Sequence, residues 1–208
     1  MKKVLSILLA LAITLVGVVP VFADENSVNG IRSLETQTEL LEYATNVFPK
    51  HLHALVEIGD LNGAVEEYSL GEPFTVFNVE ENTNSSCFPV LQNEDIVAIL
   101  EISENQGEYN SSLSVSFARE LEDILNSNMM KSFVLLTDGI HLQAFDGETS
   151  VEIFKLYNDG NEVGELSSNF TLSLSSLPKN SLQSELKTEI KADDFLHGNL
   201  YPTAIDGQ

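Results

Sequence analysis

The stretch CFPVLQNEDIVAILEI, residues 87–102, decides the fold, because it predicts two β-strands joined by a tight turn. CFPVL is a short apolar run, QNED has the composition of a turn, and IVAILEIS is almost continuously apolar. Two such runs separated by a few polar residues indicate a β-hairpin. The first strand begins with Cys87, the only cysteine of the chain.

The residues before this hairpin predict one helix and several strands. Apolar residues recur at helical spacing up to Pro49, which marks the predicted end, and Thr36 with Glu39 forms a capping box. Short strands are expected at HLHALVEIG (51–59) and AVEEYSL (64–70), around the turn at residues 60–63. A further strand, GEPFTVFNVE (71–80), is partly apolar on both faces, so we expect it inside the sheet.

The residues after the hairpin predict a second helix and a three-stranded meander. LSVSFARELEDILNS (113–127) has helical periodicity, with Ser114 or Ser116 as its cap. It follows a predicted polar loop, ENQGEYNSS (104–112), just as ENTNSS (81–86) is a predicted loop before the hairpin. The three strands are SFVLL, IHLQAF and SVEIFKLY, separated by two Asp-Gly turns. We therefore predict an α+β domain, in which an antiparallel β-sheet has two helices packed on one face.

The ends of the chain differ from this body, which spans residues 24–157. Residues 1–23 predict a secretion signal, since two lysines precede an apolar run that ends in small residues. A membrane anchor is the alternative, but Pro20 favours cleavage. DENSVNGIR (24–32) is polar and expected to be loose. Residues 158–208 predict a partly ordered tail, with FTLSLSSL as an edge strand and SLQSELKTEI as a short helix.

The charge of the chain restricts its partners. The net charge is −22, and it becomes −24 once Lys2 and Lys3 are removed with the signal peptide. Such a field repels phosphate backbones and anionic membranes, so we expect no nucleic-acid partner and, after cleavage, no membrane association. A basic protein partner, wall-associated cations and simple solubility all remain compatible with it. One cysteine forms no internal disulfide, so the fold depends on packing.

Cys87 and the histidines are the residues to weigh for catalysis and metal binding. A nucleophilic cysteine needs a cationic setting or a helix N-terminus, whereas Cys87 begins a strand, so we interpret it as a packing residue. His51 and His53 would share one face of a strand, which is a spacing that zinc sites use, but two ligands are too few. His141 has no recognisable triad partner, and His197 lies in the tail.

The acidic residues predict solvated surfaces and not a catalytic pair. Neighbouring acids occur at 66–67, 80–81, 94–95, 122–123 and 193–194, and sequence neighbours point apart on a strand. NDGNEVGE (158–165) resembles a calcium loop only in composition. We therefore predict no catalytic residue, no metal site and no cofactor.

The strand residues resemble a known family, the propeptide domain of streptopain-type cysteine proteases. The resemblance covers residues 68–125, where SLGEPFTVFNVE precedes CFPVLQNEDIVAILEI and a Ser-rich start to a helix that ends RELEDIL. The matching positions are Leu70, Gly71, Pro73, Val76, Phe77, Asn78, Phe88, Pro89, Val90, Ile96, Val97 and Leu100. What the resemblance implies is a non-enzymatic domain that blocks the cleft of a papain-like protease.

The expected function follows from this resemblance. In the family the domain precedes its protease, whereas this sequence stops at YPTAIDGQ, residues 201–208. We expect a secreted inhibitor or folding helper that acts on a separate papain-like protease; a truncated precursor is another interpretation, since papain-like enzymes carry a glutamine a few residues before their nucleophile and this sequence ends at Gln208. The alternative function is an extracellular or cell-surface binding module, and an enzyme is a third class.

Overall fold

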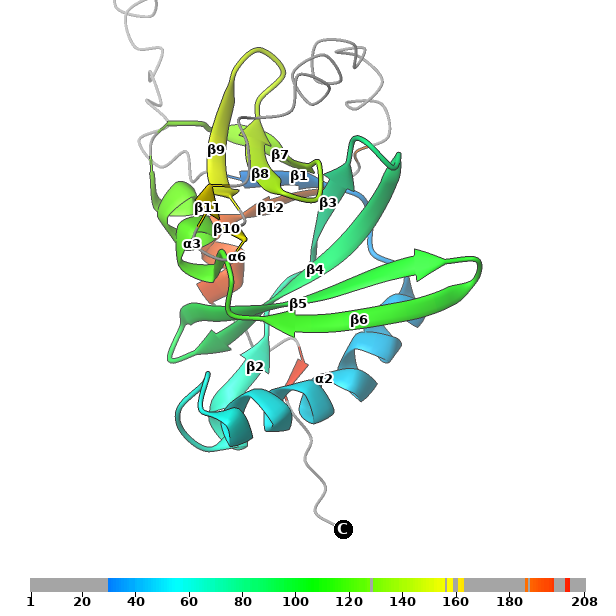
Figure 1. Ribbon diagram of the computed structural model, residues 1–208, viewed down its shortest axis with the longest axis vertical. Helices are drawn as coiled ribbons and strands as arrows, with labels where there is room; N and C mark the ends of the chain where they lie inside the picture. Colours follow the sequence, from blue (N-terminus) through cyan, green and yellow to red (C-terminus); the bar gives the residue numbers. More distant parts are fainter. Residues whose placement is uncertain are drawn as a thin grey trace, which may run out of the picture.

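The computed structural model describes residues 30–127, 129–155, 157–158, 161–162, 186, 188–196 and 201–202. The predicted signal peptide, most of the predicted tail with FTLSLSSL, and His197 lie outside these residues. Within them, an eleven-stranded sheet curls into a half-barrel with helices on both of its sides (Figure 1). This confirms the α+β class in its coarse form.

The strands and helices have the following bounds. The strands are β1 (Gly30–Ser33), β2 (Tyr68–Leu70), β3 (Phe74–Asn78), β4 (Thr83–Gln92), β5 (Asp95–Asn105), β6 (Glu108–Ser114), β7 (Ser132–Thr137), β8 (His141–Phe145), β9 (Ser150–Lys155), β10 (Tyr157–Asn158), β11 (Asn161–Glu162), β12 (Thr188–Lys191) and β13 (Tyr201–Pro202). The helices are α2 (Thr38–Ile58), the 3-10 turn η1 (Val65–Glu67), α3 (Ala118–Asn126) and α6 (Ala192–Leu196).

The sheet is mixed and not wholly antiparallel as the sequence predicted. Its central path runs β12-β1-β7-β3-β4-β2-β13, with β5 and β6 added beside β4, and β8 and β9 beside β7. Most pairs are antiparallel, but β7 runs parallel to both β1 and β3. The prediction failed here because β7 pairs with strands far away in sequence, which a hairpin pattern does not reveal.

The predicted hairpin is confirmed as β4–β5, which pairs Phe88 with Leu100. Its turn uses two residues with positive φ, Asn93 at 55° and Glu94 at 74°. The loop prediction for ENQGEYNSS was wrong, because β6 continues the sheet after a second such turn at Gln106 and Gly107. ENTNSS also joins the sheet, since β4 begins at Thr83. The meander of β7, β8 and β9 is confirmed.

Helix α2 is longer than predicted, because it continues through Pro49 to Ile58. HLHALVEIG is therefore helical, and not a strand. The helix continues because Phe48 and Leu52, on either side of the proline, are both buried against the sheet, and this packing outweighs the hydrogen bond that proline lacks. It begins after Gln37, not at the predicted Thr36 cap, and Gly59 ends it at φ 86°.

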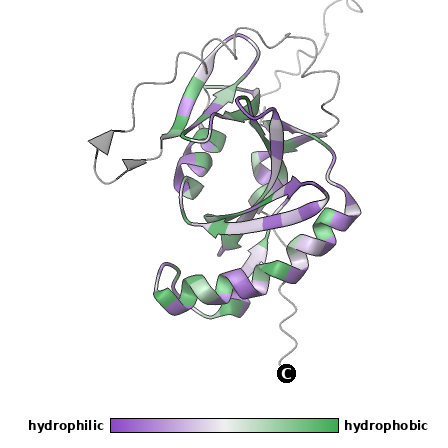
Figure 2. Cartoon of the chain, turned by 45° about the vertical axis from the view of Figure 1, so that its right-hand side comes forward, coloured by the Kyte–Doolittle hydropathy of each residue, from purple (hydrophilic) through white to green (hydrophobic). Residues whose placement is uncertain are grey.

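The two main helices lie on opposite faces of the sheet, which corrects the prediction that both pack on one face. Helix α2 buries Ala44, Phe48 and Leu52 in a cluster that includes Leu100 and Ile102 of β5. Helix α3 packs inside the half-barrel, in a cluster that includes Ile99 of β5. Because alternate residues of a strand point to opposite faces, these two clusters are on different sides of β5. Polar and apolar residues alternate along the strands accordingly (Figure 2).

The residues just before α3 and at the two ends of the described chain also differ from prediction. Helix α3 begins after Phe117, whose φ is 50°, and neither Ser114 nor Ser116 is its N-cap. Gly30–Ser33 forms β1 where a loose segment was expected. SLQSELKTEI is not a helix over its last residues, since β12 pairs antiparallel with β1. Helix α6 then places Phe195 edge-on against Phe74, with ring centroids 6.0 Å apart.

Candidate functional site

A cavity of about 460 Å³ lies inside the half-barrel, between the inner faces of β3, β4 and β5 and the turn that joins β7 to β8. We call it the half-barrel cavity. Six hydroxyl side chains line it: Thr83, Ser85, Ser103, Ser114, Ser116 and Thr137. Apolar side chains supply other parts of its wall: Val76, Phe117, Ile140, Leu142 and Phe154. The site is thus a hydroxyl-rich hollow with an apolar wall.

The alternation of β4 and β5 produces the polar side of this cavity. The register pairs Ser85 with Ser103 and Cys87 with Glu101, so these four side chains share one face of the sheet. The neighbouring residues of β4 and β5 point to the opposite face, and those that α2 covers, such as Phe88, Leu100 and Ile102, are apolar. One hairpin therefore supplies a packed core on one side and cavity-lining groups on the other.

The charged groups of the half-barrel cavity are acidic. Glu81 in the β3–β4 turn and Glu101 on β5 line it, and its described lining contains no lysine or arginine. Within the described ranges neither carboxylate takes part in an ion pair; the two ion pairs found there join Arg119 to Glu120 and Asp138 to His141. The cavity therefore has negative charge that no described side chain neutralises.

Cys87 lies at the base of the cavity and is 2% exposed. Burial raises the pKa of its thiol well above the ordinary value, and the charge of Glu101 raises the pKa further. The thiol therefore stays protonated at neutral pH, which is the opposite of what a nucleophilic cysteine needs. The packing interpretation of Cys87 remains the one that its surroundings favour.

Asp138 and His141 form a buried pair that sequence analysis missed. The side chains are 3% and 2% exposed, and Nδ1 of His141 lies 2.8 Å from Oδ2 of Asp138. Oδ1 of Asp138 accepts hydrogen bonds from the N–H groups of Ile140 at 2.8 Å and His141 at 2.7 Å. Burial acts to raise the pKa of Asp138, but these bonds outweigh it, so the pKa is lowered. The ionised carboxylate thus keeps the Nδ1 proton on the imidazole.

The signal for this pair was present in the sequence. Asp138 precedes Gly139 in a predicted tight turn, and a histidine follows three residues after the aspartate. An aspartate at this position of a turn accepts backbone hydrogen bonds from residues two and three positions later. A histidine at the third position is then brought within reach of the second carboxylate oxygen.

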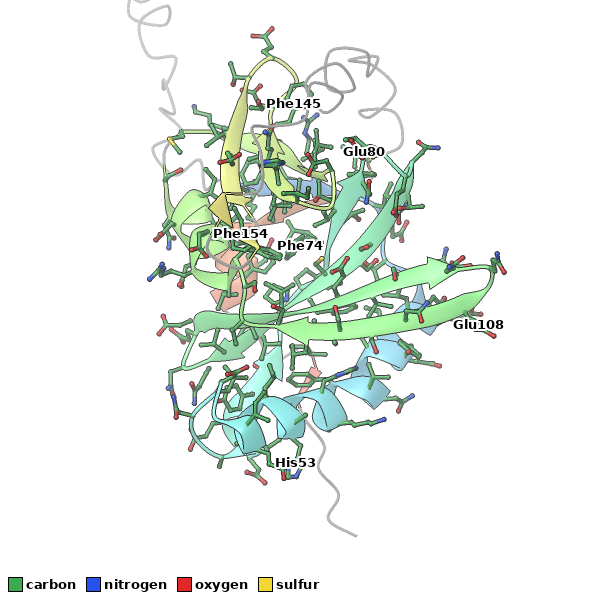
Figure 3. All side chains as sticks on the ribbon, in the orientation of Figure 1. His53, Phe74, Glu80, Glu108, Phe145 and Phe154 are labelled. Atoms are coloured by element: carbon green, nitrogen blue, oxygen red, sulfur yellow. The ribbon has the colours of Figure 1, made fainter. Side chains whose placement is uncertain are left out.

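The imidazole of His141 does not face the interior of the cavity. In β8, Leu142 and Ala144 belong to the inner cluster, whereas Phe145 packs with Val134 and Leu136 outside. Since side chains alternate, His141 shares the outer face with Phe145 and borders the cavity only at the strand end. Figure 3 labels Phe154 and Phe74 in the middle of the molecule and Phe145 near its upper end.

Cys87 and His141 therefore do not form a nucleophile–base pair. Nδ1 of His141 is bonded to Asp138, and its Nε2 has no hydrogen-bond partner among the residues that the structure describes. A catalytic cysteine requires direct contact between the thiol and the imidazole. The geometry keeps these two groups on different faces of the sheet.

The other sequence candidates do not converge. His51 and His53 lie on α2 and not on a strand, where a separation of two residues points them apart. His51 contacts the Ser111 hydroxyl at 2.9 Å, and burial, with the charge of Lys50, lowers its pKa. His53 is exposed (Figure 3). NDGNEVGE lies mostly outside the described residues. In the part of the chain that the structure describes, no three His, Cys, Asp or Glu residues form a group that could hold a metal ion.

Comparison with known proteins adds no assignment. No protein-family model matches the chain, and no curated protein matches it. Of the helices within the described ranges, none combines the length and the apolar character that crossing a bilayer requires. The half-barrel cavity is therefore the feature of the described residues that best supports a function.

Proposed function

We propose that this chain is a secreted, non-catalytic binding protein, and that the half-barrel cavity holds a small ligand. The single observation that carries the proposal is the cavity of about 460 Å³, which is within the range of ligand pockets. N-terminal sequencing of the exported protein tests the secretion part, since we expect the mature chain to begin at Asp24.

The lining of the cavity supports a binding role. Ligand pockets combine an apolar wall with a few polar groups that fix the orientation of the ligand. Val76, Leu142 and Phe154 provide apolar surface, while Ser85 and Ser103 offer hydroxyl groups from neighbouring strands. Because these groups lie on strands of one sheet, they are held in place without a ligand.

The environment of Cys87 supports a non-catalytic role. Its thiol is buried and protonated, and the buried histidine next to the cavity is engaged by Asp138 on the other face of β8. Nucleophilic catalysis requires an activated nucleophile beside its base. We expect Cys87→Val to retain ligand binding, whereas loss of binding with an intact fold would give the thiol a direct role.

An amide-resolved NMR screen of the purified protein tests the binding proposal. A library of cationic, neutral and anionic small molecules is added, and we expect saturable shifts confined to the residues that line the cavity, on β3, β4, β5, the β7–β8 turn, Ser114–Phe117 and Phe154. Ser85→Leu points a larger side chain into the cavity and should weaken binding about tenfold or more. The matched control is Asn84→Leu, since Asn84 is exposed on the opposite face. Absence of shifts for every compound, or full binding by Ser85→Leu, would contradict the proposal.

The protease-inhibitor function is the second candidate. It is supported by the resemblance over residues 68–125, which covers β2 to α3, and by the net charge of −22 for the whole chain, which complements a basic enzyme surface. Titrating the protein against a papain-like protease tests it. We expect residual activity to fall with added protein if this function holds; flat activity at micromolar protein would remove it for that enzyme.

A further inference from the structure

We propose that the half-barrel cavity binds a primary ammonium group on a short alkyl stem, with Glu101 as its counter-ion. This inference rests on the proposed binding function and names the class of ligand. It covers both a free alkylamine and the side chain of a lysine, because the two present the same group.

The charge of the cavity selects against anions and in favour of cations. Glu81 and Glu101 line it, and neither has an ion-pair partner among the described residues. Glu101 faces the cavity because it is paired with Cys87 across β4 and β5. A cation placed beside Glu101 gains a charge-assisted hydrogen bond, whereas a carboxylate or phosphate there meets a like charge.

The hydroxyl groups select a cation that donates hydrogen bonds. An ammonium group has three N–H donors and no acceptor, so it needs several acceptor atoms around it. Ser85 pairs with Ser103 across β4 and β5. On the same face of the sheet, this pair lies next to the pair of Cys87 and Glu101. Their oxygens, with the Glu101 carboxylate, can receive N–H donors. A quaternary ammonium group has no N–H and cannot use them.

The apolar wall accounts for the alkyl stem. Leu142 and Val76 are buried at the wall, 5% and 6% exposed. Phe117 and Phe154 form a tilted ring pair with centroids 6.1 Å apart, and both rings line the cavity. Methylene groups placed next to these side chains leave water, which favours binding of an alkyl stem there. The inferred ligand therefore has a charged end near Glu101 and an apolar end near the rings.

The test compares four probes that share a butyl stem and differ in their head group. The probes are n-butylammonium, n-butyltrimethylammonium, n-butanol and butyrate, each titrated into the protein while NMR shifts are followed. We expect n-butylammonium to bind most tightly, butyrate to produce no shifts at the cavity, and added salt to weaken ammonium binding. Glu101→Gln should weaken n-butylammonium about fivefold, since Glu101 is exposed and its charge is partly screened.

The matched control is Glu104→Gln. Glu104 lies on the same strand, is also exposed, and faces the opposite side of the sheet, so the total charge changes equally while the cavity does not. Equal weakening by the two variants would show that only the overall charge matters and would overturn the assignment of Glu101. Equal binding of n-butanol and n-butylammonium, unaffected by Glu101→Gln, would overturn the ligand class while leaving the binding function standing.

One further comparison shows whether the ammonium group belongs to a free alkylamine or to a lysine side chain, and one further outcome would refute the binding function itself. A lysine peptide blocked at both ends that binds at least about tenfold tighter than n-butylammonium would support a protein side chain as the ligand. Weaker binding of the peptide would support a free alkylamine. If none of the four probes and no member of the wider library shifts the cavity residues, both the ligand class and the proposed function are wrong.

Discussion

Near Cys87 and Glu101 the two faces of the β4–β5 hairpin differ in character, although they alternate residue by residue along the same two strands. On the face toward α2, Phe88 pairs with Leu100, and both side chains are fully buried. On the face toward the half-barrel, the next pairs along are Cys87 with Glu101 and Ser85 with Ser103. In this part of the hairpin one face is therefore an apolar core and the other forms the wall of a cavity, whereas nearer the turn the inner face is apolar too, with Leu91, Ile96 and Ile99 in the cluster that includes α3.

This contrast shows how a small chain keeps a cavity open without losing its fold. Fully burying a large apolar side chain contributes about 1.5–3 kcal/mol, so the α2 face alone provides much of the stability of the hairpin. The inner face is then free to carry small polar residues that fill little space. We infer that the candidate site arises because one face of the hairpin packs against α2 while the other carries small polar residues, and not from the hairpin alone.

The largest expected effect comes from Phe88→Ala on the α2 face. Removal of this fully buried ring leaves a cavity against α2, and we expect the free energy of unfolding to fall by about 3–5 kcal/mol. Ser85→Ala on the same strand should change it by less than about 0.5 kcal/mol, because Ser85 is only half-buried on the cavity side. Urea denaturation of both variants measures the difference; similar losses would show that the cavity face also supports the fold.

The β7–β8 hairpin provides the second test, since it too has an inner face at Leu142 and an outer face at His141. Asp138→Ala removes the acceptor for the exposed N–H of Ile140 and for the partly buried N–H and imidazole of His141, so we expect a loss of about 2–3 kcal/mol. The measurement is again the free energy of unfolding in urea.

Asp146→Ala is the control for this prediction. Asp146 accepts the N–H groups of Glu148 and Thr149, each at 2.8 Å, in the same kind of turn, but it is only half-buried and its second carboxylate oxygen accepts the Thr149 hydroxyl in place of an imidazole. We therefore expect a loss of less than about 1 kcal/mol. If Asp146→Ala costs as much as Asp138→Ala, the turn bonds alone matter and the buried pair adds nothing.

The same contrast between faces explains which strands the sequence predicts. The β4–β5 hairpin is visible because its face toward α2 is apolar on both strands, at Phe88, Val90, Ala98, Leu100 and Ile102. Strand β6 is not, because its residues alternate between exposed and half-buried and most are polar, so they have the composition of a loop. These residues form a strand because they pair with β5, and the pattern of residues within β6 alone does not predict that pairing.

The part of helix α2 after Pro49 and the candidate site were missed for related reasons. Pro49 is a strong local signal for a helix end, yet the burial of Phe48 and Leu52 against the sheet overrides it. The cavity draws residues from β3, β4, β5 and the β7–β8 turn, and only the register brings them together. Asp138 and His141 are the exception, since their spacing in one turn made the contact local and therefore predictable.

The smallest expected effect is a pH dependence on the inner side of the sheet, where α3 packs. Burial, then the charge of Asp95, raises the pKa of Glu122 on α3, although a hydrogen bond from the Ile96 N–H opposes this. A raised pKa means that the folded state takes up a proton before the unfolded state does. Stability therefore increases as the pH falls from 7 toward the ordinary glutamate value of 4.5.

Two aspartates impose the opposite trend at lower pH. The pKa values of Asp138 and Asp146 are lowered, so their stabilising hydrogen bonds are present above the ordinary value of 3.8 and are lost as the pH falls further. We thus expect maximum stability in the mildly acidic range between these two ordinary values, measured as the melting temperature across pH.

Glu122→Gln should stabilise the protein at pH 7 by about 0.5 kcal/mol, allowing for solvent screening, and flatten the rise on acidification. Glu42→Gln, on an exposed part of α2, is the control; if it flattens the curve equally, the effect belongs to the total negative charge and not to the inner side of the sheet.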